Sequence, residues 1–72
     1  MVVKLEDRKL RLFKLVEHWA EHGQEHGQRY LEAAAEAEEM GLGEVAEELR
    51  AAHRLTVEAS KHLEKALSLG EG

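Results

Sequence analysis

The chain has 72 residues, of which 43% are hydrophobic and 35% charged, with no cysteine and no proline. This length suits one small domain over residues 1–72, whose modest core we expect a metal or an oligomer to stabilise. The lack of cysteine excludes a disulfide framework, a thiolate nucleophile and a cysteine-based metal site. The formal charge is −5 and basic residues alternate with acidic ones, which argues against nucleic acid as a partner.

The first predicted element is a helix over about residues 5–40. Its apolar positions recur mostly in steps of three and four, a heptad pattern typical of a helix that packs on another helix. Gly23 and Gly27 interrupt this pattern, each at a cost of up to about 1 kcal/mol relative to alanine, so a kink would fall near Gly23. The predicted apolar stripe consists of Leu5, Leu12, Val16, Trp19, Gly23, His26, Tyr30, Ala33, Ala37 and Met40.

The N-terminal stretch MVVKLEDRKLRLFKLV carries a charge every few residues. A membrane span needs about 20 consecutive apolar residues, and a signal peptide needs an uninterrupted apolar segment. The sequence therefore predicts no membrane span and no signal peptide, and we expect a cytoplasmic location.

The stretch MGLGEVAEEL predicts a turn at residues 41–43 and a second helix over about residues 44–69. Gly41 or Gly43 can adopt the left-handed conformation that ends a helix, and Glu44 suits the positive end of the next one. Gly70 is expected to stop the second helix. Its predicted apolar stripe consists of Val45, Leu49, Ala52, Thr56, Ala59, Leu63 and Ala66.

These elements predict an all-α fold, a long antiparallel helical hairpin. Two thin helices leave much of each apolar stripe in water. Two hairpins that pack together would bury these stripes, and symmetric dimers are the commonest oligomers. We therefore expect a homodimer that forms a four-helix bundle, with a higher closed oligomer as the alternative.

The segment HWAEHGQEH places His18, His22 and His26 four residues apart. Imidazoles at this spacing project from consecutive turns of one helical face, so two of them can chelate one ion. A rise of about 12 Å separates His18 from His26, too far for both to bind the same ion. At most two of these histidines share a metal.

Folding the chain about Leu42 brings His22 near His62 and His26 near Glu58. Three imidazoles and a carboxylate suit Zn, Ni, Co, Cu or Fe. His18, at the outer end of the ladder, is either a transfer ligand or a surface residue, and His53 on the opposite flank is interpreted as a surface residue without a role. The predicted metal ligands are His22, His26, His62, His18 and Glu58.

The runs EHWAEHGQEHGQRY and AEAEEMGLGEVAEELRAA resemble a family of short, uncharacterised helical-hairpin domains with an H-W-x-E-H-N-x-E-H core, over about residues 10–69. The resemblance implies a hairpin whose histidine ladder contacts a metal, with a link to nickel or cobalt handling. The family has no established activity that the resemblance could carry over to this chain. This chain departs from the pattern at Gly23, where asparagine is usual, and at Gly27, where alanine is common; His62 lies outside the pattern.

The sequence predicts a metal carrier, buffer or sensor for Ni, Co, Zn or Cu, and not an enzyme, since it has no nucleophile elbow, P-loop or HExxH motif. One alternative is a homo-oligomeric interaction module, able to bind a protein partner, whose assembly responds to histidine protonation near pH ~6.5. Another is haem held between His26 and Trp19 or Tyr30.

Overall fold

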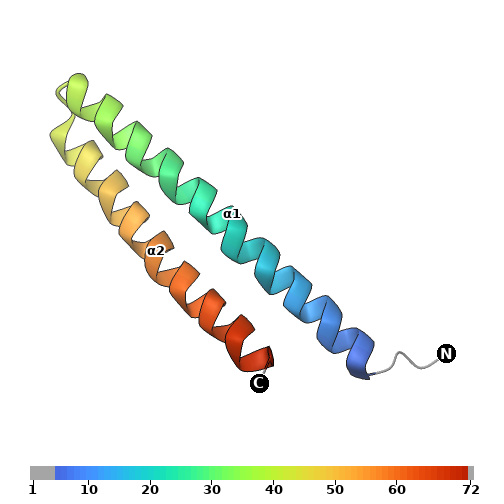
Figure 1. Cartoon of the computed structure of the whole chain (residues 1–72). Coiled ribbons are helices and arrows are strands. Elements are labelled where there is room, and N and C mark those ends of the chain that lie inside the picture. The colour runs from blue at the N-terminus through green and yellow to red at the C-terminus, as the bar shows by residue number, and fades with distance from the viewer. Residues whose placement is uncertain (1–4, 72) are drawn as a thin grey trace.

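The structure, a computed structural model, describes residues 5–71. Helix α1 spans Leu5–Glu39 and helix α2 spans Gly43–Glu71. The two helices lie side by side and antiparallel (Figure 1), in a flat rod of 58 × 24 × 13 Å. The predicted all-α helical hairpin is confirmed.

The turn between the helices is closed by backbone hydrogen bonds. Gly41 has a φ of 76°, a left-handed conformation that favours glycine. Its N–H donates to the carbonyl of Glu38 at 3.0 Å, and the N–H of Leu42 donates to the carbonyl of Ala37 at 2.8 Å. This pair of bonds is a Schellman motif, which satisfies carbonyls at the end of α1. Gly41 is therefore the residue that ends the helix, and Gly43 begins α2.

The helices pack through small side chains. No large side chain is fully buried in the part of the chain that the structure describes. Because the distance between two helices depends on the side chains at their contact, alanine and glycine allow a close approach. The buried positions are Val16, Ala20, Gly27, Ala34 and Ala37 of α1 and Ala46 and Ser60 of α2.

The predicted apolar stripe of α1 is wrong at four bulky positions, since Leu12, Trp19, His26 and Met40 are all exposed. Trp19 is 47% exposed and His26 is also exposed, whereas their neighbours Ala20 and Gly27 are buried between the helices. The stripe is wider than one neighbouring helix can cover, and the contact falls on smaller residues along its edge. In α2 the same shift buries Ser60 in place of Ala59. The bulkier part of the α1 stripe is left facing solvent.

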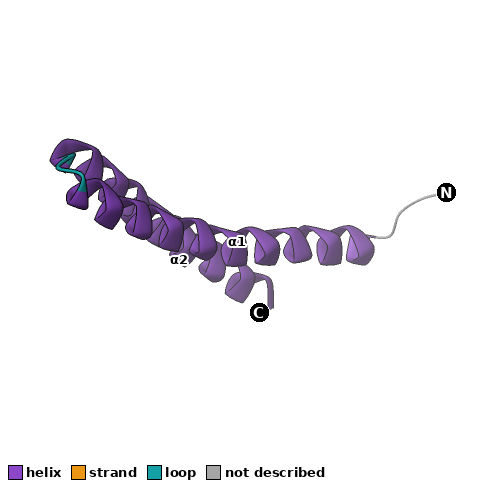
Figure 2. Cartoon of the chain, turned by 90° about the horizontal axis from the view of Figure 1, so that it is seen from above, coloured by secondary structure: helices purple, strands orange, loops and turns teal. Residues whose placement is uncertain are grey.

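The C-terminal end of the hairpin also differs from the sequence prediction. Gly70 does not stop α2, which continues to Glu71. A Cβ atom at Gly70 would overlap the ring of Phe13, so the glycine makes room for this half-buried aromatic. Helix α1 is unbroken through Gly23 and Gly27, and Figure 2 shows it bowed along its length.

Neither helix, over residues 5–71, contains an apolar stretch sufficient to cross a bilayer.

Candidate functional site

The histidines of α1 form a continuous row of rings on its surface, in which His18 stacks on His22 and His26 meets His22 edge to face at 80°. The ring centroids of His18 and His22 lie 5.0 Å apart, and those of His22 and His26 lie 5.1 Å apart. Tyr30 extends the row, with its centroid 6.4 Å from that of His26. All three imidazoles are exposed. The helix thus presents a ladder of accessible nitrogen donors with the spacing predicted from the sequence.

The spacing of the imidazoles suits an ion shared between neighbours. A transition metal binds an imidazole nitrogen at about 2 Å, so two rings that share one ion have centroids roughly 5 Å apart. Glu25 does not fix the His22 ring, because its carboxylate lies 3.9 Å from Nδ1 of His22, beyond hydrogen-bond distance. The ladder can therefore offer two imidazoles to one ion from a single helix.

The other predicted ligands do not join the ladder within one chain. His62 is exposed on α2, and the Glu58 carboxylate lies 3.5 Å from the ammonium of Lys61. Over residues 5–71, no three or more histidine, aspartate or glutamate side chains are grouped so that they could hold a metal ion. The structure brings His18, His22 and His26 together, and it leaves His62 and Glu58 apart from them.

One broad face of the hairpin is crossed by hydrogen bonds, and within residues 5–71 it exposes only Leu10, Leu31 and Val57 among the large apolar residues of its two heptad series. The amide of Gln24 donates to the carboxylate of Glu64 at 3.3 Å, and the guanidinium of Arg50 donates to that of Glu38 at 3.0 Å. Gln24 and Glu38 are fourteen residues apart on α1, and Arg50 and Glu64 are fourteen residues apart on α2. Because a spacing of two heptads keeps residues on one side of a helix, both bonds join the helices along the same flank. We refer to this side as the polar face.

The opposite side carries most of the exposed large apolar residues, and we refer to it as the apolar face. In α1, Leu12, Trp19 and Met40 lie seven or fourteen residues from His26. In α2, Leu55 lies seven residues before His62 and Leu69 lies seven residues after it. Heptad spacing keeps each set on one side of its helix. Two of the predicted ligands therefore sit within an apolar surface. This surface consists of Leu12, Leu15, Trp19, Met40, Val45, Leu55 and Leu69, each at least 44% exposed.

His53 has a structural role that the sequence analysis missed. Its Nδ1 atom lies 3.0 Å from the carbonyl oxygen of Gly27, in a partly buried contact between the helices. Because a carbonyl only accepts, Nδ1 carries the proton and donates it. The interpretation of His53 as a surface residue is therefore wrong. The signal that identifies it is the heptad series Ala46, His53, Ser60 and Leu67, which runs beside the stripe selected from the sequence.

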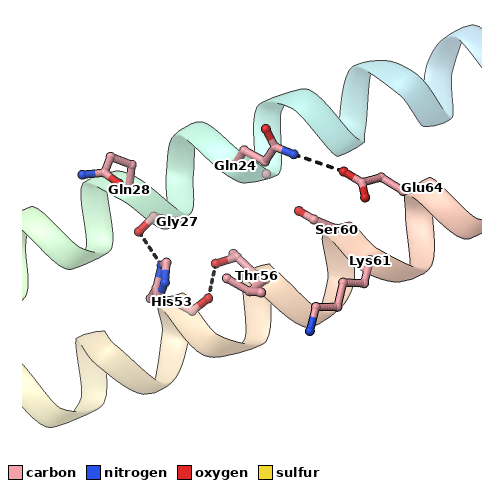
Figure 3. A pocket seen from close by; sticks show the side chains of 10 residues that line it. Gln24, Gly27, Gln28, His53, Thr56, Ser60, Lys61 and Glu64 are labelled. Atoms are coloured by element: carbon pink, nitrogen blue, oxygen red, sulfur yellow. Dashed lines mark hydrogen bonds between the residues drawn. The ribbon is translucent and has the colours of Figure 1, made fainter.

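Beside His53 a shallow hollow of about 290 Å³ opens between the helices. It exists because Gly23 and Gly27 bring no side chains to this contact, and Figure 3 shows Ser60 pointing from α2 toward α1 there. The hydroxyl of Thr56 donates to the carbonyl of His53 at 2.6 Å, within its own helix. The hollow lies apart from the ladder, on the side crossed by the bond from Gln24 to Glu64.

A family model described as "Domain of unknown function (DUF8180)" matches residues 12–70. No curated protein and no solved structure matches the chain. The matched region contains both helices, the turn, the histidine ladder, His53 and His62. The description of the family assigns no ligand to any of these residues.

Proposed function

We propose that this chain, which belongs to the DUF8180 family, binds a divalent transition metal ion through its histidine ladder, with His22 and His26 as the central ligands. The observation that carries the proposal is the 5.1 Å separation of these two ring centroids. It matches the separation of two imidazoles on one ion. Of the two neighbouring histidine pairs in the ladder, His22 and His26 lie closer to the apolar face, because His26 belongs to the heptad series of Trp19.

The chemistry of the site favours metal binding over metal-dependent catalysis. Imidazole donors suit zinc, copper, nickel and cobalt, whereas magnesium and calcium prefer oxygen. The exposed ladder has no enclosed cavity in which a substrate would be held beside the ion. We therefore assign a carrier, buffer or sensor role rather than an enzymatic one. The resemblance of HWAEHGQEH to a histidine-containing hairpin family adds nickel and cobalt as the first ions to test, and a cytoplasmic location remains our prediction.

The test is a titration of chelator-stripped protein with Ni, Co, Zn and Cu, followed by native mass spectrometry. The wild-type chain should take up a fixed number of ions, and the His22→Ala/His26→Ala variant should lose them. Both residues are exposed and alanine favours helix, so the variant should keep its helical circular dichroism. Full stoichiometry in this variant would refute the proposal.

A composition-matched variant separates geometry from histidine content. The double change His22→Gln/Gln28→His keeps five histidines and the net charge but leaves no two histidines of α1 four residues apart. We expect this variant to bind as weakly as the double alanine variant, because chelation by one helix requires that spacing. Wild-type binding by the matched variant would show that the ladder geometry is irrelevant.

The second candidate function is a homo-oligomeric interaction module without metal. The apolar face supports it, since seven large apolar side chains are exposed there and contiguous patches of this kind mark interaction surfaces. In this case assembly would depend on pH through the histidines that share the face, in the presence of a chelator. Unchanged mass and helicity from pH 8 to pH 5 would exclude that form of the module.

A further inference from the structure

The single hairpin exposes more surface than a compact protein of its mass. Its accessible surface is 6017 Å², whereas a folded monomer of 8.1 kDa is expected to expose about 4,500 Å². The excess is roughly 1,500 Å² per chain, and two chains that bury it would form an interface in the range of permanent homodimers. A second copy of the chain is the partner whose area matches this excess.

The positions of the apolar residues allow two arrangements of the two copies, which differ in what meets the ladder. Large apolar side chains cluster at the open end of the hairpin, where Leu12, Leu15 and Leu69 lie, and again beside the turn at Met40 and Val45. If the turns of both copies lie at the same end, α1 of one copy packs over α2 of the other and each cluster meets its counterpart. If the copies run in opposite directions, the open-end cluster of each copy meets the turn cluster of the other and α1 packs over α1, so this arrangement brings no histidine of α2 to the ladder.

The register of the hairpin then determines what meets the ladder. Gly23 lies opposite Ser60 and Gly27 lies opposite Thr56, so His22 and His62 lie at the same level along the rod. Within one chain His62 stands on the other helix, and no group of three ligands forms among residues 5–71. When α1 packs over the partner's α2, the partner's His62 comes to lie over His22.

We infer that the metal site is completed across a homodimer, with His22 and His26 from one chain and the partner's His62 as the third imidazole. The inference rests on the proposed metal-binding function and adds the assembly and the stoichiometry. Two-fold symmetry produces two such sites per dimer. Three imidazoles leave one coordination position open on a tetrahedral ion, the state that permits transfer to another ligand.

Subunit complementation tests this assignment. The His22→Ala/His26→Ala variant lacks one part of each site, and the His62→Ala variant lacks the other, so each homodimer should bind Ni²⁺ or Zn²⁺ at least tenfold more weakly than wild type. A heterodimer of the two variants contains one complete site. Native mass spectrometry separates the heterodimer by mass, and it should carry one tightly bound ion, half the number on the wild-type dimer.

The matched control pairs a wild-type chain with a His22→Ala/His26→Ala/His62→Ala chain. A site shared between chains predicts no complete site in this heterodimer, whereas a site within one chain predicts one. Retention of one tight ion there, a wild-type protein that stays monomeric, or one ion per wild-type dimer would overturn the shared site alone. If the wild-type chain binds no ion at all, the proposed function falls as well.

Discussion

The Nδ1 atom of His53 lies 3.0 Å from the carbonyl oxygen of Gly27, so a histidine side chain on α2 donates a hydrogen bond to the backbone of α1. This contact is made where Gly27 contributes no side chain. It joins the two helices at a point where the rest of their interface consists mainly of alanine, serine and threonine. His53 therefore has a structural role that the exposed histidines of α1 do not share.

Replacing His53 should lower the stability of the hairpin. We expect His53→Ala to reduce the free energy of unfolding by about 1–2 kcal/mol, because it removes a partly buried hydrogen bond and the packing of the ring. The measurement is urea unfolding followed by circular dichroism, at one protein concentration and with a chelator present. His18→Ala is the control, since His18 is exposed and bonds to no residue of the other helix. Equal stability of the two variants would contradict the role of His53.

The two glycines of α1 should respond oppositely to alanine. A Cβ at Gly27 would lie 2.8 Å from the Thr56 hydroxyl, which is already bonded within α2, so Gly27→Ala should destabilise the hairpin by about 1–2 kcal/mol despite its better helix propensity. A Cβ at Gly23 would lie 3.5 Å from Ser60 Oγ, an ordinary contact. Gly23→Ala should therefore stabilise the protein by up to about 1 kcal/mol. Thermal unfolding of both variants checks the pair, and a stabilised Gly27→Ala would refute the close contact.

The apolar face should control assembly while the polar face should not. Leu55 on the apolar face is 71% exposed, and Leu10, on the flank of Gln24, is 58% exposed. We expect Leu55→Glu to weaken self-association at least tenfold, because it places a charge in the buried interface, and Leu10→Glu to leave it nearly unchanged. Sedimentation velocity over a concentration series measures both. A stronger effect at Leu10 would place the interface on the polar face.

Trp19 reports on the ladder, because it is the only tryptophan of the chain and lies three residues before His22. Cu²⁺ or Ni²⁺ bound at the ladder should quench its fluorescence at stoichiometric amounts. The quenching should disappear on acidification to about pH 5, since protons compete with the ion for imidazole nitrogen. His22→Ala/His26→Ala should abolish the response, and His53→Ala should retain it. Loss of quenching in the His53 variant alone would move the site to the other side of the hairpin.

The sequence by itself determined the helices, the turn and the register, because each depends on neighbours along the chain. Periodic apolar residues identify a helix, and Gly41 supplies the left-handed conformation that ends α1. The short turn then leaves little freedom in how the helices align. The prediction that His22 and His62 lie at the same level agrees with the observed pairing of Gly23 and Ser60.

Only the tertiary structure decided which side of each stripe faces the other helix. In α1 the apolar stripe covers more of the surface than one partner can bury, and adjacent residues such as Trp19 and Ala20 are both compatible with the periodicity. Packing selects Ala20 and Gly27 because small residues let the helices approach closely, and this leaves Trp19 and His26 exposed. The same rotation of α2 turns His53 inward. Close packing of the helices therefore separates a structural histidine from an exposed ladder. The periodicity of the sequence alone could not predict this separation.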